Sequence, residues 1–420
     1  MSCKQTIIIF IAAALCLSIG ADFAHAQSSD ELQPRGIELG VLRFHPGAFV
    51  ESTYDSNYFY QDAGETLDAD FADVLVVKPG ISARFELPDP GPTAWTFGAR
   101  ASWEQYLGLD NEVSTGGAEA HLDTTLTLFR QSLVSLIPKL AYMRVNGPAD
   151  DFLRRNYNQH TIEPGLELNI QPEGGTVFSQ RIGWNLRGRF FDDVDDLNNI
   201  DNRFTAATKW NFLPQTAFTL LLEQRIVSYL TAQRTPSAST NFTLENVNST
   251  PFRVMAGLQG LLLDRLDVTL LGGYGYTFYD GGANEHVPMG RAELGYKFLG
   301  DSRISLGWVH DFGDSSFGNY YVFDRFYASF QTHFLHRFSL ELSPKVNLQR
   351  FAAVAGVGER SDILYDVDAS LSYIFVAGLT ARLSYMLRGD ETDFSTTVDG
   401  RTTSGAYTKH LVVLNLAYEY

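Results

Sequence analysis

Alternation of apolar and polar residues with a period of two recurs along the chain and constrains its fold more than any other feature. Between Arg337 and Gln349 one face carries Phe338, Leu340, Leu342, Pro344, Val346 and Leu348. The opposite face of this segment is polar, and the segments Thr176–Phe190 and Ile363–Phe375 repeat the pattern. Strands of this kind put one face in an apolar environment and the other in water. The pattern therefore indicates an all-β protein whose sheet separates two such environments.

The connections between these strands alternate in length. Short connections occur at Arg130–Ser132, Leu213–Gln215, Leu263–Arg265, Leu335–Arg337 and Val376–Gly378. Long polar connections lie between them, at Tyr60–Asp70, Asn146–Asn158, Asp192–Asn199, Leu230–Ser249, Ala352–Arg360 and Asp390–Gly405. Short turns on one side and long loops on the other are typical of bacterial outer-membrane barrels. We therefore expect a transmembrane antiparallel up-and-down β-barrel of about 18 strands (16 to 20 as the range) over residues 44–420.

The first residues resemble a secretory signal. Lys4 supplies a positive charge, Ile7–Ile19 is a short apolar stretch, and Ala24–Ala26 is a small-x-small cleavage motif. We expect residues 1–26 to be a signal peptide and residues 27–43 a short periplasmic segment before the barrel.

Composition fits such a barrel without requiring it. The chain has 420 residues, a formal net charge of −17, 30 Phe and 20 Tyr. Cys3 and Cys16 both lie in the expected signal, so the mature chain is expected to hold no disulfide. No later stretch approaches the ~18 apolar residues of a membrane helix, and so acidic a chain is a poor candidate for nucleic acid binding. A large soluble β protein has the same composition, and that alternative stays open on composition alone.

The last strand ends the chain on an aromatic residue. Its apolar face carries Val412, Leu414, Leu416, Tyr418 and Tyr420. This pattern resembles the C-terminal signal that barrel-assembly machinery recognises in its clients.

Prolines lie inside several expected strands, at Pro46, Pro79, Pro138, Pro164 and Pro344. Each removes a donor from the hydrogen-bond ladder, which a strand with neighbours on both sides normally does not tolerate. We expect local β-bulges at these positions, and functional kinks are the alternative.

The segment His45–Phe59, HPGAFVESTYDSNYF, resembles the opening of the β-barrel porin 2 family. Members typically begin with a Pro-containing strand that runs into a Tyr-Asp-x-Asn-aromatic segment. The repeated Pro-bearing strands extend the resemblance loosely along the chain. It implies an outer-membrane barrel, and many members are associated with exopolysaccharide synthesis and secretion. No catalytic residues follow from it.

Alternation also predicts which charged side chains face the inside of the barrel. The expected pore-lining residues are Arg84, Arg100, Arg181, Arg187, Arg189, Arg203, Arg225, Arg253, Arg291, Arg303, Arg382, Arg388, Glu104, Glu163, Glu167, Glu223, Glu293, Glu341, Asp366 and Asp368. One interpretation is a transverse field that orients polar or anionic solutes, with Arg forks suited to carboxylates or phosphates. The other is a hydrated wall whose charges pair with one another.

The sequence offers only weak candidates for a catalytic site or a metal site. His310-Asp311 and Ser315-Ser316 are the best candidates for a hydrolase at the rim, but no elbow motif or third partner accompanies them, and we expect no enzyme. The acidic runs Asp192–Asp196 and Asp390–Asp393 suggest a Ca²⁺ or Mg²⁺ site. The first lacks the glycine and terminal Glu of an EF-hand, and solvated loops are the favoured interpretation. We expect no metal and no cofactor.

The leading hypothesis is a porin of the bacterial outer membrane that gives polar solutes passive passage, or serves as the conduit of an exopolysaccharide secretion system. The alternative is a non-conducting surface-binding or structural barrel that acts through its acidic loops. Expected partners are membrane lipid and lipopolysaccharide, the barrel-assembly machinery and polysaccharide export components. If Leu230–Ser249 folds inward, it narrows the bore.

Overall fold

The computed structural model describes residues 34–58, 73–88, 91–107, 117–148, 156–171, 177–192, 195–231, 246–281, 284–298, 302–315, 320–354, 358–398 and 401–420. The chain divides into two units, Met1–Gln33 and Pro34–Tyr420. The first unit, which includes the predicted signal peptide, lies outside the described residues.

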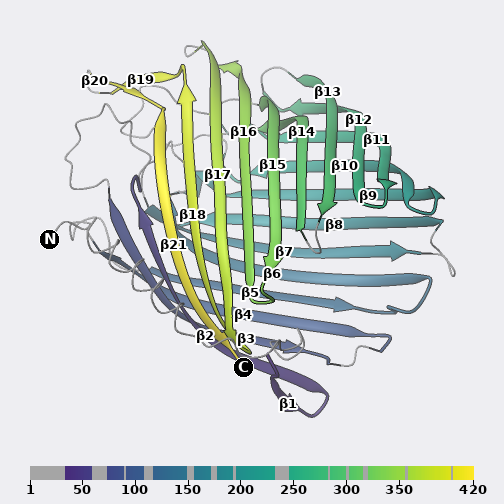
Figure 1. The fold of residues 1–420 in the computed structure, drawn as a ribbon. Coiled ribbons are helices and arrows are strands. Elements are labelled where there is room, and N and C mark those ends of the chain that lie inside the picture. Colours follow the sequence, from purple (N-terminus) through teal and green to yellow (C-terminus); the bar gives the residue numbers. More distant parts are fainter. Residues whose placement is uncertain are drawn as a thin grey trace. The chain divides into compact units, whose positions relative to one another are not determined.

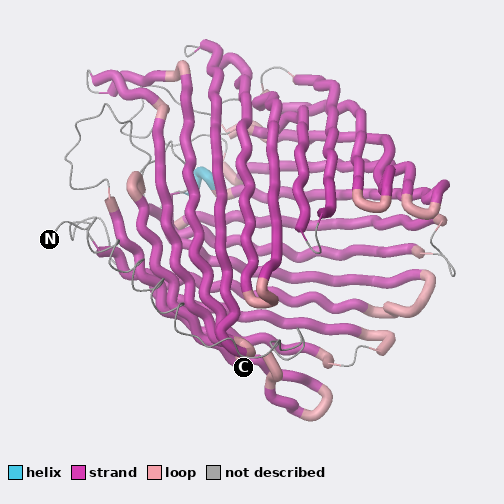
Figure 2. Tube along the Cα trace, viewed as in Figure 1, coloured by secondary structure: helices cyan, strands magenta, loops and turns pink. Residues whose placement is uncertain are grey.

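The second unit is an antiparallel β-barrel, and almost all of its described residues are in strands (Figures 1 and 2). The barrel strands are β2 (Leu42–Asp55), β3 (Val74–Glu86), β4 (Ala94–Leu107), β5 (Gly117–Thr127), β6 (Val134–Pro148), β7 (Asn156–Ile170), β8 (Phe178–Phe191), β9 (Asn199–Leu213), β10 (Thr216–Tyr229), β11 (Ser249–Leu263), β12 (Leu266–Tyr279), β13 (Glu285–Phe298), β14 (Ser302–Asp314), β15 (Tyr320–Phe334), β16 (Phe338–Val354), β17 (Gly358–Val376), β18 (Leu379–Thr392) and β21 (Tyr407–Glu419). Each pairs with its neighbours in this series, so that β18 pairs directly with β21.

The barrel closes where its first strand meets its last. Strand β2 pairs with β3 on one side and with β21 on the other, in a register that runs from Gly47↔Glu419 to Asp55↔Leu411. Closure leaves no free sheet edge along this seam, so the backbone satisfies its own hydrogen bonds there. The prediction of a closed antiparallel barrel of about 18 strands is confirmed by the described residues.

The connections lie on two sides as expected. Residues 214–215, 264–265, 335–337 and 377–378 make tight links at one end, and residues 56–73, 230–248 and 393–406 make long ones at the other. The last connection contains a small hairpin, β19 (Ser395–Val398) with β20 (Arg401–Ser404). One expected long loop, Ala352–Arg360, is shorter than predicted, because β16 and β17 extend into it and leave only residues 355–357.

Residues 34–43 belong to the predicted periplasmic segment. The three-residue strand β1 (Ile37–Leu39) pairs with the start of β2 as a short hairpin. Among the described residues no helix is long and apolar enough to cross a membrane. The 3-10 helix η3 (Asp195–Leu197) is a single turn.

The outer face of the barrel is apolar and exposed. The exposed apolar side chains on this face include Leu122, Leu140, Ile162, Phe204, Phe218, Leu258, Leu294, Phe326, Leu371 and Leu414. Aromatic rings contact each other on this face near the short turns, as in Phe44–Phe85 and Phe338–Tyr373, with ring centroids 4.7 and 4.5 Å apart. Apolar bands with aromatic girdles are the outer surface that a lipid bilayer requires.

The expected bulges at the prolines are wrong. Pro164 pairs with Leu140 of β6, and the β7–β8 ladder skips this position but resumes at Gly165↔Asn185 in the same register. Pro344 likewise pairs with Val367 of β17 and interrupts only the ladder to β15. Because proline lacks one N–H, it loses bonding toward one neighbour only, and no extra residue is needed to accommodate it.

Candidate functional site

The inner face of the barrel is a charged wall. Strand register puts every predicted lining residue on this face, opposite the exposed apolar side chains. In unbulged strands successive side chains alternate strictly between the two faces, so one correctly placed residue fixes the rest of its strand. Their role as pore lining stays a prediction.

Most of these charges pair with one another, along one strand, between adjacent strands or across one intervening strand. Arg181 and Lys139 both contact Glu167, at 3.1 and 3.0 Å. Arg303 lies 2.6 Å from Asp267, and Arg382 lies 3.1 Å from Glu341. Further pairs join Arg84 to Glu86, Arg100 to Glu51, Arg187 to Glu163, Arg291 to Glu293, and Arg388 and Lys345 to Asp366, and Lys345 also approaches Asp368. The self-pairing interpretation therefore accounts for most of the wall.

Bases exceed acids on three adjacent strands. Strand β8 puts Arg181, Arg187 and Arg189 on the inner face with no acid, β9 adds Arg203 and Lys209, and β10 adds Arg225. The inner acids of these strands are Asp201 and Glu223. We call the six bases the basic sector. Among the predicted lining residues, only Arg189 makes no ion pair with another described residue, and Lys209, which is exposed, makes none either.

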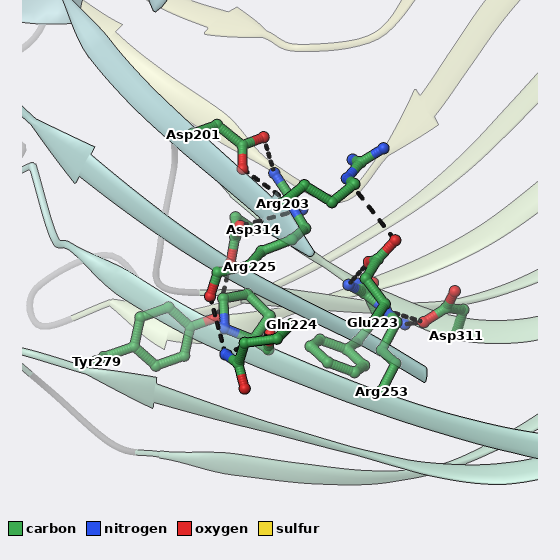
Figure 3. Close-up of polar contacts among 11 residues, drawn as sticks. Asp201, Arg203, Glu223, Gln224, Arg225, Arg253, Tyr279, Asp311 and Asp314 are labelled. Carbon is green, nitrogen blue, oxygen red and sulfur yellow. Dashed lines mark hydrogen bonds and ion pairs between the residues drawn. The ribbon is translucent and has the colours of Figure 1, made fainter. Parts of the chain in front are cut away.

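A network of ion pairs connects β9, β10, β11 and β14 (Figure 3). Arg225 lies between Asp201 and Asp314, at 2.8 and 3.5 Å. Arg253 lies between Glu223 and Asp311, at 2.8 and 3.1 Å, and Arg203 approaches the same glutamate at 3.7 Å. Arg225 and Asp314 are thus in contact although three strands separate them in the sheet order.

A second network lies on β3, β4 and β5. Lys78 pairs with both Glu104 and Glu119, and Glu104 accepts a hydrogen bond from the Tyr106 hydroxyl at 2.7 Å. Tyr106 packs with Tyr58, Val74 and Val76 in a buried apolar cluster on the same face. The inner wall here is packed rather than bare, because Glu104 is only 2% exposed.

The other predicted sites gain no support from the geometry. His310 lies 2.9 Å from Asp324 on the outer face, whereas Asp311 pairs with Arg253 on the inner one, so His310 and Asp311 do not form a dyad. Ser316, Asp193, Val194 and most of Leu230–Ser249 lie outside the described residues. Within the described ranges, no three His, Cys, Asp or Glu side chains are placed to hold a metal ion.

Two kinds of inner residue were not predicted from the sequence. Asp201 and Lys409 share a face with predicted residues, so alternation was a sufficient signal for both. Phe312 and Asp314 fall on the apolar, outward face of their strand by alternation, yet Phe312 is 2% exposed and Asp314 contacts an inner-wall arginine. No local pattern marks these two residues.

A closed barrel with an apolar outer surface and a charged inner wall is the architecture of a bacterial outer-membrane protein. This barrel therefore resides in the bacterial outer membrane.

The chain matches no family model and no curated protein. Among solved structures it is similar to the outer membrane protein OpdK of Pseudomonas aeruginosa, at 12% identity and a TM-score of 0.48, covering 90% of this chain and 99% of that one. OpdO of the same organism is 13% identical, with a TM-score of 0.49 and coverage of 90% and 97%. A BenF-like porin of Pseudomonas fluorescens Pf-5 is 10% identical, with a TM-score of 0.49 and coverage of 91% and 100%. At this distance the likenesses assign neither a family nor a solute, and membership of the β-barrel porin 2 family stays a prediction.

Proposed function

We propose that the protein is a porin: a passive channel for polar solutes, with a preference for anions. A barrel of this strand number is wide enough to enclose water rather than a packed core. The observation that carries the proposal is the basic sector, in which Arg189 and Lys209 have no carboxylate partner among the described residues. Unpaired cations on the wall of an aqueous channel attract carboxylates or phosphates and repel cations.

Planar-bilayer recording tests the proposal. Purified protein in lipid bilayers should produce discrete conductance steps, and a salt gradient should give a reversal potential of the sign for anion selectivity. A correctly folded protein that never conducts contradicts the assignment. Conductance with a cation preference retains the channel and removes the role of the basic sector.

A narrower role in exopolysaccharide secretion rests on the resemblance of the segment His45–Phe59 alone. If the channel passes polysaccharide, neutral oligosaccharides added to one chamber should block the current in a size-dependent way. Contact with the barrel-assembly machinery is proposed on the apolar stripe that ends at Tyr420. Deleting that residue should slow insertion into membranes that contain the machinery.

A non-conducting structural barrel is the second candidate, and burial of the inner wall favours it. Glu104, Asp362 and Asp390 are each 2% exposed, which indicates that parts of the wall are covered. This candidate predicts no conductance step in a folded, membrane-inserted protein.

A further inference from the structure

Pairing between β13 and β14 stops halfway along the two strands. It runs from Phe298↔Ser302 to Gly290↔His310 and no further, although both strands continue within the described residues. Over the same stretch, β14 stays paired with β15 as far as Asp314↔Tyr320. Strand β15 also stays paired with β16, as far as Tyr321↔Phe351. The sheet therefore parts only between β13 and β14, and the ends of β14 and β15 move away from β13 together with the adjoining end of β16.

The outward side of these two strand ends packs against the inner face of the neighbouring strands. Phe312 of β14 and Val322 of β15 lie opposite each other, and they contact Val287, Met289 and Met255 from the inner face of β13 and β11. Gly275, on the inner face of β12, receives the Phe312 ring, since a Cβ at that position would collide with it. The ends of β14 and β15 thus form a second layer inside the barrel, continuous with β16. We call residues 311–314 and 320–323 the inner flap.

Polar contacts hold the inner flap in this position. Tyr320 donates a hydrogen bond to Glu285 of β13 at 2.5 Å, and its ring stacks on Tyr279 of β12 with centroids 6.1 Å apart. Arg253 pairs with Asp311, donates to the Phe312 carbonyl at 2.6 Å, and places its guanidinium 4.3 Å from the centre of the Phe312 ring. Arg225 reaches Asp314 (Figure 3).

We propose that the inner flap is the movable constriction of the channel, latched into the lumen by Arg225 and Arg253 and able to rejoin β13. The inference rests on the proposed channel function, and it adds which part of the barrel determines the width of the channel. In the latched state, a second layer of side chains occupies space that a single-layer wall would leave to water. In the released state, the flap resumes the β13–β14 register beyond Gly290↔His310, which pairs 286 with 314 and 288 with 312. The carboxylates of Asp311 and Asp314 favour the latched state, because the arginines they meet stand on the inner wall.

The test removes the latch and keeps the shape of the side chains. The double variant D311N/D314N should raise single-channel conductance by roughly twofold, because the current follows the open cross-section of an aqueous barrel. The control D264N/D280N removes two carboxylates from connections outside the inner wall, so it should conduct as the wild type does. Equal conductance of the latch variant, the control and the wild type overturns the inference.

A crosslink reports the flap independently of current. The triple variant H286C/D311N/D314C should form a disulfide under mild oxidation, because residues 286 and 314 oppose each other only when the flap has rejoined β13. The pair A292C/W308C, opposite each other in the paired half, should crosslink in every case. A control pair that crosslinks while the flap pair does not overturns the inference. A flap pair that crosslinks in a protein that never conducts supports the moving flap and contradicts the channel function instead.

Discussion

The Nδ1 atom of His45 lies 3.0 Å from the backbone carbonyl oxygen of Tyr420, the last residue of the chain. The other ring nitrogen of His45 lies 3.1 Å from Glu86, and the histidine is 2% exposed. The Tyr420 amide donates to the Pro46 carbonyl at 2.9 Å, and Glu419 beside it binds Arg84. One buried histidine therefore connects β2, β3 and the chain end at the seam that closes the barrel.

Replacing His45 with alanine should weaken this seam. The change removes two hydrogen bonds and leaves a carbonyl and a carboxylate without their partner, at a cost of about 1–3 kcal/mol. Guanidinium unfolding of the barrel in lipid vesicles measures the loss. His121→Ala is the matched control, because His121 is also on the inner wall but 50% exposed. An equal loss in both variants would mean that the seam contacts of His45 contribute nothing specific.

The far end of the same seam holds a buried ion pair. Lys409 of β21 lies 2.8 Å from Asp55 of β2, and the two side chains are 4% and 5% exposed. Lys409→Met should cost about 3–5 kcal/mol in free energy of unfolding, because it leaves the carboxylate buried without its partner. The double variant D55N/K409M should recover most of that loss. If the double variant is less stable than K409M alone, the hydrogen bond that the Asn57 amide donates to the Asp55 carboxylate outweighs the cost of burying the unpaired charge.

Pro344→Val should stabilise the barrel. The valine restores an N–H toward β15 where the ladder is interrupted, and neither neighbouring register has to change. One hydrogen bond of this kind contributes about 1 kcal/mol. The same unfolding experiment measures it, with Leu342→Val on the same face of β16 as the control for side-chain change. A destabilised P344V would show that the interruption itself is needed, for instance for local twist.

The faces of the strands were predictable from the sequence, and the layering of the inner flap was not. Alternation assigns Arg181, Glu167 and Asp366 to the inner wall because a strand without bulges keeps a strict period of two. The same rule assigns Phe312 to the lipid-facing side, which agrees with its position in the alternation of β14. It fails because the β13–β14 ladder ends early, which depends on contacts among strands β10 to β14 rather than on the local sequence of β14.

The ion pairs of the inner wall were likewise only partly predictable from the sequence. That charged side chains face inward follows from alternation, whereas their partners depend on register between strands. The contact of Arg225 with Asp314 crosses three strands, and no rule about adjacent strands predicts it. For the prolines, the sequence rule predicted bulges that do not form. The strands accommodate each proline by losing hydrogen bonds toward one neighbouring strand, without a change of register.

The two unpaired bases of the basic sector should set ion selectivity. Arg189 is half-buried and Lys209 exposed, and neither has an ion pair with a described residue, so neither charge is neutralised by a carboxylate in direct contact. The variant R189Q/K209Q should shift the reversal potential in a KCl gradient toward cation preference, with little change in conductance.

The control R130Q/R265Q removes two positive charges from short turns outside the wall. Charges at the mouth act within about one Debye length, ~10 Å at 0.1 M salt, and are screened there by bulk ions. The control should therefore shift the potential less, and the difference should persist as the salt concentration is raised. Equal shifts in both variants would assign the selectivity to the overall charge of the protein and not to the inner wall.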